Sequence, residues 1–444
     1  MSLTWARNPE RVRIEGATLV DPASGQQTDR SVLIDRGRVA ALGTPADESP
    51  VDRVVSGHGC LLTPGLTDLY ASLREPGDGQ KGSMASEARA AARGGFTTVC
   101  TAPDSSPVND SGAITSLIRD LAARHSPIQV LPLGAATREL AGERLSDMVG
   151  LTGSGCVALS NGGEPLANAR VLRRCMAYAR TFGITLMLQP ENATLAAGGF
   201  AHDGRITARL GLVGVPEVAE TAAVAEMVLL AEETGVRLHL SQLSTARGVA
   251  MLREARDRGL AVTGDVAIHH LCFTEEALGG FDSRFHLRPP LRSERDRQAL
   301  LAGVNDGTLS AIVSQHQPHD DAAKRAPLAE TAPGLSTIES VLSLGLERVA
   351  AGELEQSALI RALTVGPAAV LDLPEPALVE GAHADLCLFD PAAEWHPSAD
   401  TLLSTGKNAP VMDRSLPGVV HQTWCGGHPV HSTGDNAGNG SGLT

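Results

Sequence analysis

Fourteen histidines are present, and four of them stand where apolar runs give way to polar residues, which is where metal chemistry would need them. His269 and His270 follow one such run, and His316 and His319 follow another. Imidazole is a common zinc ligand, and zinc-bound water ionises near neutral pH, so these side chains raise the possibility of a metal-dependent hydrolase. Catalysis needs about three converging protein ligands with one open position. We therefore expect loop histidines here, with a relocated metal site as the alternative.

Other nucleophile and acid–base patterns are weaker. Ser241 and Ser244 lie close to His239, but the segment is not the strand–turn–helix elbow of a serine hydrolase. Asp320-Asp321 is expected to be a solvated loop and not a carboxylate dyad. The late histidines are expected on the surface, with a minor chance of adventitious metal: His383, His396, His421, His428 and His431.

The elements that must position these residues alternate regularly between about 62 and 370. Eight short apolar runs predict strands, and amphipathic stretches such as 86–95 and 217–234 predict helices between them. This repeat predicts an α/β fold, a (β/α)8 TIM-type barrel, whose function sits at the carboxyl ends of its strands. The predicted strands are 61–70, 96–102, 128–134, 155–160, 184–189, 236–242, 260–267 and 309–315.

The two ends of the chain have a different pattern. Residues 11–60 and 383–431 read as strands with turns, and neither segment has enough strands to stand alone. We expect residues 1–60 plus 371–431 to form one composite β-domain beside a barrel of residues 61–370. The composition of residues 432–444 is typical of a disordered tail.

The strand ends carry a family resemblance. The segments PGLTDLYASLREPG (64–77), ARAAARGGFTTV (88–99) and PPLR (289–292) resemble those of dihydroorotases in the cyclic amidohydrolase superfamily, and the similarity covers nearly the whole chain. In that family the first motif has the form PGxxDxHxHLREPG, and its two histidines bind zinc. The resemblance implies the same barrel and the same place for the active centre.

Six positions that hold metal or transfer protons in that family carry other residues in this chain. The resemblance places metal-binding histidines at positions 70, 72, 189 and 242, a metal-bridging aspartate at position 161 and the catalytic aspartate at position 315. In this chain the six residues there are uncharged, while the surrounding frames match. These vestigial positions are Tyr70, Ser72, Asn161, Gln189, Gln242 and Gln315.

The replacements remove the chemistry that zinc hydrolysis requires. Amide and hydroxyl oxygens suit zinc poorly, and a tyrosine must first lose a proton whose pKa is near 10. Gln315 cannot accept or release a proton. A carbamylated lysine can bridge metals in related hydrolases, but Lys81, Lys324 and Lys407 are the three lysines of the sequence and none ends a predicted strand. We therefore expect no catalytic residue, no metal and no other cofactor.

The family's substrate pocket is partly retained. The resemblance makes Arg74 a carboxylate-binding residue, whereas Asp104 replaces an asparagine and would repel a carboxylate. Arg288 replaces another asparagine, and His319 closes the last motif. We hypothesise that Arg288 pairs with Asp104 and fills the pocket.

Composition limits the setting and the partners. The net charge is −14, spread along the chain, which argues against nucleic acid or an anionic membrane as partner. Seven cysteines are scattered without a paired motif, so reduced thiols are expected. No apolar stretch is long enough to span a membrane, and the N-terminus lacks signal-peptide features. We expect a cytoplasmic protein.

Dihydroorotase-like chains without zinc ligands occur in bacteria as inactive subunits of aspartate carbamoyltransferase, and this chain resembles them. The resemblance implies a pseudoenzyme, not an enzyme, that serves as an assembly subunit for the carbamoyltransferase in a hetero-oligomer of de novo pyrimidine (UMP) biosynthesis. Two alternatives remain open. One is an active dihydroorotase or related cyclic amidohydrolase with atypical ligands, and the other is a small-molecule sensor that uses the pocket around Arg74 and Arg288.

Overall fold

An eight-stranded parallel sheet lies at the centre of the computed structural model, which describes residues 9–412 and 414–433. The strands pair in chain order, and nearly all their side chains are buried, as expected where helices cover a parallel sheet. The predicted barrel is therefore confirmed. Its strands are β8 (Leu66–Ala71), β9 (Phe96–Thr101), β10 (Gln129–Ala135), β11 (Ala158–Ser160), β12 (Leu186–Leu188), β15 (Leu238–Leu240), β16 (Val262–Ala267) and β17 (Ala311–Val313).

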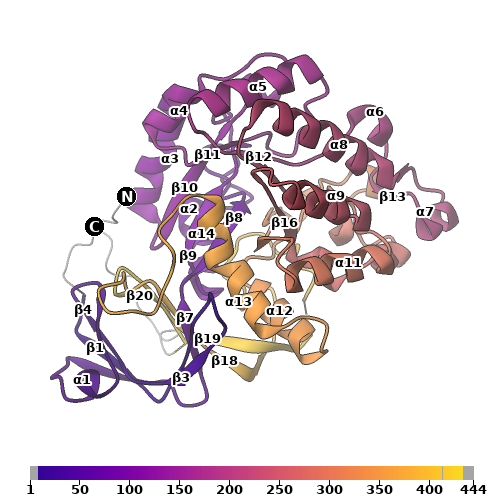
Figure 1. Cartoon of the computed structure of the whole chain (residues 1–444). Coiled ribbons are helices and arrows are strands. Elements are labelled where there is room, and N and C mark those ends of the chain that lie inside the picture. The colour runs from indigo at the N-terminus through magenta and orange to yellow at the C-terminus, as the bar shows by residue number, and fades with distance from the viewer. Residues whose placement is uncertain (1–8, 413, 434–444) are drawn as a thin grey trace.

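Helices surround this sheet (Figure 1). Several begin with a side-chain cap, such as Ser83 before α2 and Thr245 before α9, which satisfies a free backbone N–H. The longer helices are α2 (Met84–Arg93), α3 (Gly112–His125), α4 (Met148–Ser154), α5 (Ala169–Thr181), α8 (Glu217–Thr234), α9 (Ala246–Asp257), α11 (Glu294–Asn305), α12 (Val341–Ala350) and α13 (Gln356–Leu363). Short helices are α1 (Thr44–Asp47), α6 (Ala193–Ala196), α7 (Arg205–Leu210), α10 (Ile268–Cys272) and α14 (Val365–Val370), and a small two-stranded sheet joins β13 (Ala201–His202) to β14 (Gly214–Val215).

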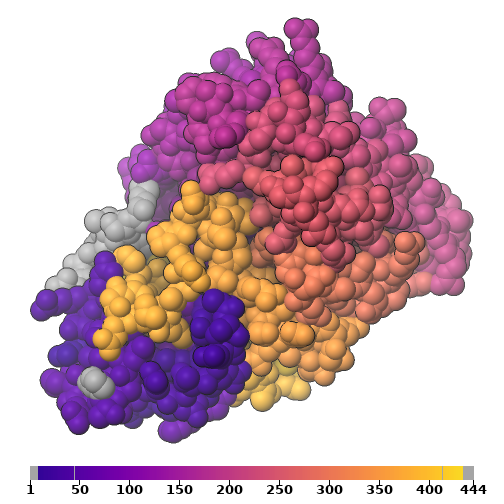
Figure 2. All heavy atoms as spheres, viewed as in Figure 1, coloured from indigo at the N-terminus to yellow at the C-terminus, as the bar shows by residue number. Residues whose placement is uncertain are grey.

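Strands from both ends of the chain form two further sheets. Figure 2 shows the indigo residues of the N-terminal part gathered at one end of the molecule. Apolar side chains from the two sheets, including Ile14, Leu62 and Trp424, pack into one core cluster. The four-stranded sheet has β5 (Arg38–Leu42), β4 (Val32–Asp35), β1 (Val12–Glu15) and β6 (Arg53–Ser56). The six-stranded sheet has β20 (His428–Ser432), β19 (Leu416–Cys425), β18 (Leu386–Trp395), β7 (Leu61–Pro64), β2 (Thr18–Val20) and β3 (Gln27–Asp29).

The strand predicted over 61–70 is two strands. β7 pairs with β18 and β2 in the terminal sheet, and β8 opens the barrel after Gly65. A Cβ at Gly65 would collide with Thr97, so the chain can change sheets here only on a residue without a side chain. Most of the predicted tail, residues 434–444, lies outside the described residues. No described helix has the length and apolar character needed to cross a membrane.

The barrel closes between its first and last strands through side chains. β8 and β17 do not share a continuous ladder, although Ala71 and His316 form a parallel bridge. Asp68 on β8 accepts hydrogen bonds from the backbone N–H of Ser314 at 3.0 Å and from the Ser314 hydroxyl. Beside it, Ser72 N–H donates to the carbonyl of His316 at 2.8 Å. These bonds fix the two strand ends that flank the mouth.

Asp68 should make the stability of the protein depend on pH. Burial raises the pKa of its carboxyl from 3.8 to about 7, against hydrogen bonds from Ser314 and Tyr70 that favour the charged form. A carboxyl whose pKa is raised by folding stabilises the fold most below its unfolded pKa, and that contribution is lost as the pH rises through the folded pKa. We expect Asp68→Asn to remove this pH-dependent loss of stability. The melting temperature of the variant should therefore rise relative to that of the wild type as the pH increases from about 4 to about 8.

The matched control is Asp372→Asn, at an exposed carboxylate that pairs with Arg237. The melting temperature of this variant should change with pH in the same way as that of the wild type. If the melting temperature of Asp68→Asn also changes with pH as that of the wild type does, Asp68 is not a buried carboxyl of raised pKa.

Candidate functional site at the barrel mouth

The carboxyl ends of the barrel strands bring the six predicted positions to one place, the mouth of the barrel. Tyr70 is the last residue but one of β8, Asn161 follows β11, and Gln189 follows β12. Gln242 follows β15 and Gln315 follows β17. All six side chains, Ser72 included, are buried, with at most 5% of each exposed. The structure therefore brings these six residues together at the mouth of the barrel.

Three of the amide side chains hold the mouth together by hydrogen bonds. Gln315 Nε2 donates to Gln242 Oε1 at 3.0 Å and to the carbonyl of Arg288 at 2.8 Å. Asn161 Nδ2 donates to the carbonyl of Gln189 at 3.0 Å, and Asn161 Oδ1 accepts from Gln189 N–H at 2.9 Å. Loops that follow β11, β12, β15 and β17 are thus joined by neutral side chains.

Some polar atoms of the same side chains lack a partner within the described part of the chain. They are Gln189 Nε2, Gln242 Nε2 and Gln315 Oε1. A buried polar atom without a hydrogen bond lowers the stability of the fold by about 1–3 kcal/mol. These three atoms mark the polar centre of the mouth. Two of the three are N–H donors, which repel a metal ion.

The side chains at the six positions do not fit the zinc that the resemblance would imply. Burial, and then the charge of Asp104, raise the pKa of Tyr70 well above its ordinary value, so the phenol stays protonated. The Ser72 hydroxyl donates to Asp104 Oδ2 at 3.0 Å. Among the described residues, no group of three His, Cys, Asp or Glu side chains is placed to hold a metal ion. We derive no chemical step through a metal here.

The four histidines singled out from the sequence do not form a ligand set. The rings of His269 and His270 lie 4.7 Å apart, and burial lowers the pKa of both, to about 4 for His270. His316 bonds Glu87 Oε2 at 2.9 Å, with both side chains fully buried, and so links the end of β17 to α2. His319 faces Arg74 and the carbonyl of Pro333. His269 and His270 lie on the short helix α10, and His316 and His319 lie in the loop after β17, so the expectation of loop histidines holds for two of the four.

The hypothesis that Arg288 pairs with Asp104 is wrong. Arg288 Nη2 lies 2.6 Å from Glu191 Oε1, and its Nη1 lies 3.8 Å from Glu164 Oε2. Glu191 follows Gln189 by two residues and Glu164 follows Asn161 by three, so each loop presents a carboxylate at the rim. Arg288 Nε and Nη2 both donate to the Glu191 carboxylate, which is the bidentate geometry that suits a guanidinium, whereas Asp104 lies beside Arg74. Both glutamates stand within the QPEN and SNGGEP segments, and their spacing after the motif residues was the available signal.

Asp104 instead faces Arg74. Arg74 Nη1 lies 4.0 Å from Asp104 Oδ2, and Arg74 Nε donates to the carbonyl of Pro318 at 3.0 Å. The guanidinium is therefore engaged by this chain's own oxygens where the resemblance places a substrate carboxylate. Burial, and then the charge of Arg74, lower the pKa of His319 to about 4, so this imidazole is neutral at pH 7.

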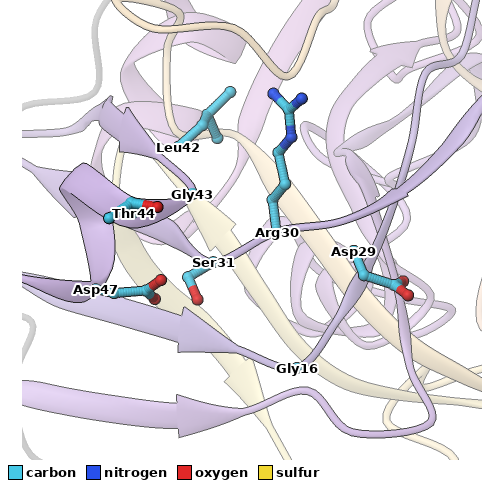
Figure 3. A pocket seen from close by; sticks show the side chains of 8 residues that line it. All are labelled: Gly16, Asp29, Arg30, Ser31, Leu42, Gly43, Thr44 and Asp47. Carbon is cyan, nitrogen blue, oxygen red and sulfur yellow. The ribbon is translucent and has the colours of Figure 1, made fainter.

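A different hollow is lined by residues of the N-terminal part of the chain, none of which lies at the mouth (Figure 3). It has a volume of about 550 Å³, is open to solvent, and is lined by Asp29, Arg30, Thr44 and Asp47 among others. Asp29 already accepts from Thr18 at 2.7 Å. The side chains shown do not converge on one point, so this hollow is not a candidate site.

Comparisons with known proteins point to one family. A family model described as Dihydro-orotase-like matches residues 59–247. A dihydroorotase-like protein of Pseudomonas aeruginosa is 44% identical over 420 residues, which cover 95% of this chain and 99% of the relative. A dihydroorotase of Anaeromyxobacter sp. is 42% identical and covers 95% and 98%. The L-hydantoinase from Arthrobacter aurescens shares the fold, with a TM-score of 0.85 at 21% identity over 95% and 96% of the two chains.

These comparisons contradict the prediction that the chain is not an enzyme. Relatives named dihydroorotase match it at identities from 42% down to 36% over most of its length, and the hydantoinases that share its fold are enzymes. The prediction failed because it treated the loss of six side chains as the loss of all activity. Side-chain replacement at known positions shows that those groups are absent and says nothing about others.

Zinc content tests the conclusion that the side chains at the mouth do not hold zinc. After equilibration with zinc and desalting, the wild-type protein should retain far less than one zinc ion per chain, because amides and a protonated phenol are poor ligands. Restoring the family's residues with Tyr70→His, Ser72→His, Asn161→Asp, Gln189→His, Gln242→His and Gln315→Asp should raise the zinc content to at least one ion per chain. One or two tightly held zinc ions in the wild type would overturn this reading, whatever the restored variant does.

Proposed function

Since this chain belongs to the dihydroorotase-like family, we propose that it serves pyrimidine biosynthesis as a subunit that assembles with the catalytic chain of aspartate carbamoyltransferase. One observation carries the proposal. The whole fold is retained, while the six mouth positions carry side chains that bond to one another and to neighbouring backbone. A protein that keeps its fold in this way is suited to a role performed through contact with another protein.

The rim supports the same proposal. The Arg288–Glu191 ion pair and the Gln315–Arg288 hydrogen bond tie the loop before α11 to the loops after β12 and β17. Such ties hold the loops in one arrangement without any bound ligand. A stable partner of this kind needs rigid surfaces more than an open pocket.

Co-expression with the carbamoyltransferase catalytic chain tests this proposal. We expect the two chains to co-elute as one assembly with a mass above that of either protein alone, measured by size-exclusion chromatography with light scattering. Carbamoyltransferase activity should elute with that assembly. Separate elution of the two proteins, each at the mass it has alone, would contradict the proposal.

The names of the relatives favour a second candidate, in which the chain itself is a dihydroorotase or a related cyclic amidohydrolase. This candidate needs catalytic groups outside the six positions. The neutral imidazoles near the mouth are weak bases, since the pKa values of His270 and His319 are about 4. The retained group that suits an anionic substrate is Arg74.

Ring opening of dihydroorotate, followed by absorbance with the purified chain, tests the second candidate. If the mouth binds the substrate carboxylate, Arg74→Ala should lower kcat/KM by about tenfold or more, because a charged hydrogen bond is lost. Arg173→Ala, at an exposed ion pair on α5, is the matched control and should leave the rate unchanged. A rate equal to the uncatalysed rate would rule the second candidate out.

A further inference from the structure

Arg74 presents a guanidinium to the barrel mouth three residues after the end of β8. Its φ of 66° lies in the left-handed region that non-glycine residues rarely adopt, and only 9% of its side chain is exposed. Nε donates to the carbonyl of Pro318 at 3.0 Å, and Nη2 lies 3.5 Å from His319 Nε2. Within the described part of the chain, Nη1 makes no hydrogen bond. That nitrogen is therefore the point at which Arg74 can bind an oxygen of a ligand.

Asp104 faces this nitrogen and is held in place by Ser72. Asp104 Oδ2 lies 4.0 Å from Arg74 Nη1. The Ser72 hydroxyl lies 3.0 Å from the same oxygen and 3.3 Å from Oδ1, so it donates to the carboxylate. Ser72 follows β8 and Asp104 follows β9, so this contact joins two neighbouring strand ends. A carboxylate at this distance cancels much of the attraction that the guanidinium would exert on an anion.

The hollow beside Arg74 and Asp104 is too small for a second carboxylate. Residues that follow β8 and β9 line it, including Pro76 and Ser106. Its volume is about 10 Å³, which is the space that one water molecule needs. A carboxylate is larger than a water molecule, so it can reach Arg74 only after Asp104 has moved. Asp104 can turn outward, because 27% of its side chain is exposed.

The neighbouring cations are also paired with carboxylates of this chain. Arg288, on the other side of the mouth, lies 2.6 Å from Glu191 and 3.8 Å from Glu164. Lys81 lies 2.9 Å from Asp78, which lines the same hollow as Arg74. An anion that enters the mouth therefore meets a carboxylate beside each of these positive groups, and it gains little from any of them.

We propose that Asp104 is an internal counter-ion that closes Arg74 to anionic ligands and so sets the specificity of the mouth against small carboxylates. Asp104 occupies the side of the guanidinium that a ligand carboxylate needs, and Ser72 keeps it there. The mouth consequently favours uncharged ligands, and it accepts a carboxylate only when Asp104 is neutralised or turned away. This inference goes beyond the proposed function and does not depend on it, because it concerns the mouth and not assembly with another chain.

The test measures ligand binding to the full-length chain at pH 7 by isothermal titration calorimetry. Dihydroorotate carries a carboxylate, and dihydrouracil is the same ring without it. We expect Asp104→Asn to lower the Kd for dihydroorotate by about tenfold or more, because the amide keeps the size of the side chain but no longer repels an anion. The Kd for dihydrouracil should stay within about twofold of the wild type, since this ligand has no charge to be repelled.

Two further variants locate the effect. The matched control is Asp78→Asn, which removes the same charge from the same hollow, although its carboxylate pairs with Lys81 and not with Arg74. This control should leave the Kd for dihydroorotate within about twofold of the wild type. Adding Arg74→Ala to Asp104→Asn should abolish the gain, because Arg74 is the group that binds the carboxylate. The melting temperatures of the variants show whether each of them is folded.

Three results would overturn the proposal. The first is a wild-type chain, or an Asp78→Asn chain, that binds dihydroorotate as tightly as Asp104→Asn does. The second is an equal gain for dihydroorotate and dihydrouracil, which would show that the effect of Asp104 is not on the carboxylate. The third is a gain that persists without Arg74. None of these results changes the expected assembly with the carbamoyltransferase, so the two proposals fail separately.

Discussion

The seam between β8 and β17 closes the barrel, and the positions of the mouth residues depend on it. Ser314 donates twice to Asp68, and Ser72 N–H bonds the carbonyl of His316. On the outer side of the same seam, His316 forms a fully buried pair with Glu87 on α2. These contacts tie the first strand, the last strand and the first helix into one unit, and Tyr70, Ser72 and Gln315 project from it.

The residues at the barrel mouth are joined to one another by hydrogen bonds between uncharged groups. Gln242 and Gln315 have φ values of 58° and 46°, which lie in the left-handed region that non-glycine residues rarely adopt. Strained positions of this kind persist where the surroundings force them, and they often mark functional centres. The backbone thus keeps a special geometry at the two strand ends, while the side chains it presents there are amides.

The sequence was sufficient for the barrel and for the gathering of its six mouth positions, because the strand–helix alternation is regular and the motif frames fix where each strand ends. It was insufficient where a contact joins distant loops. Arg288 was assigned to Asp104 because both replace family asparagines, yet Glu191 and Glu164 lie nearer in space. The break at Gly65 was also missed, since β7 and β8 form one apolar run and separate only through their different sheets.

Native mass spectrometry of the chain co-expressed with the carbamoyltransferase catalytic chain tests the central claim most directly, since one spectrum reports both partner and bound metal. We expect a hetero-oligomer in which this chain carries no zinc. A spectrum that shows this chain by itself, with one or two zinc ions bound, would contradict it.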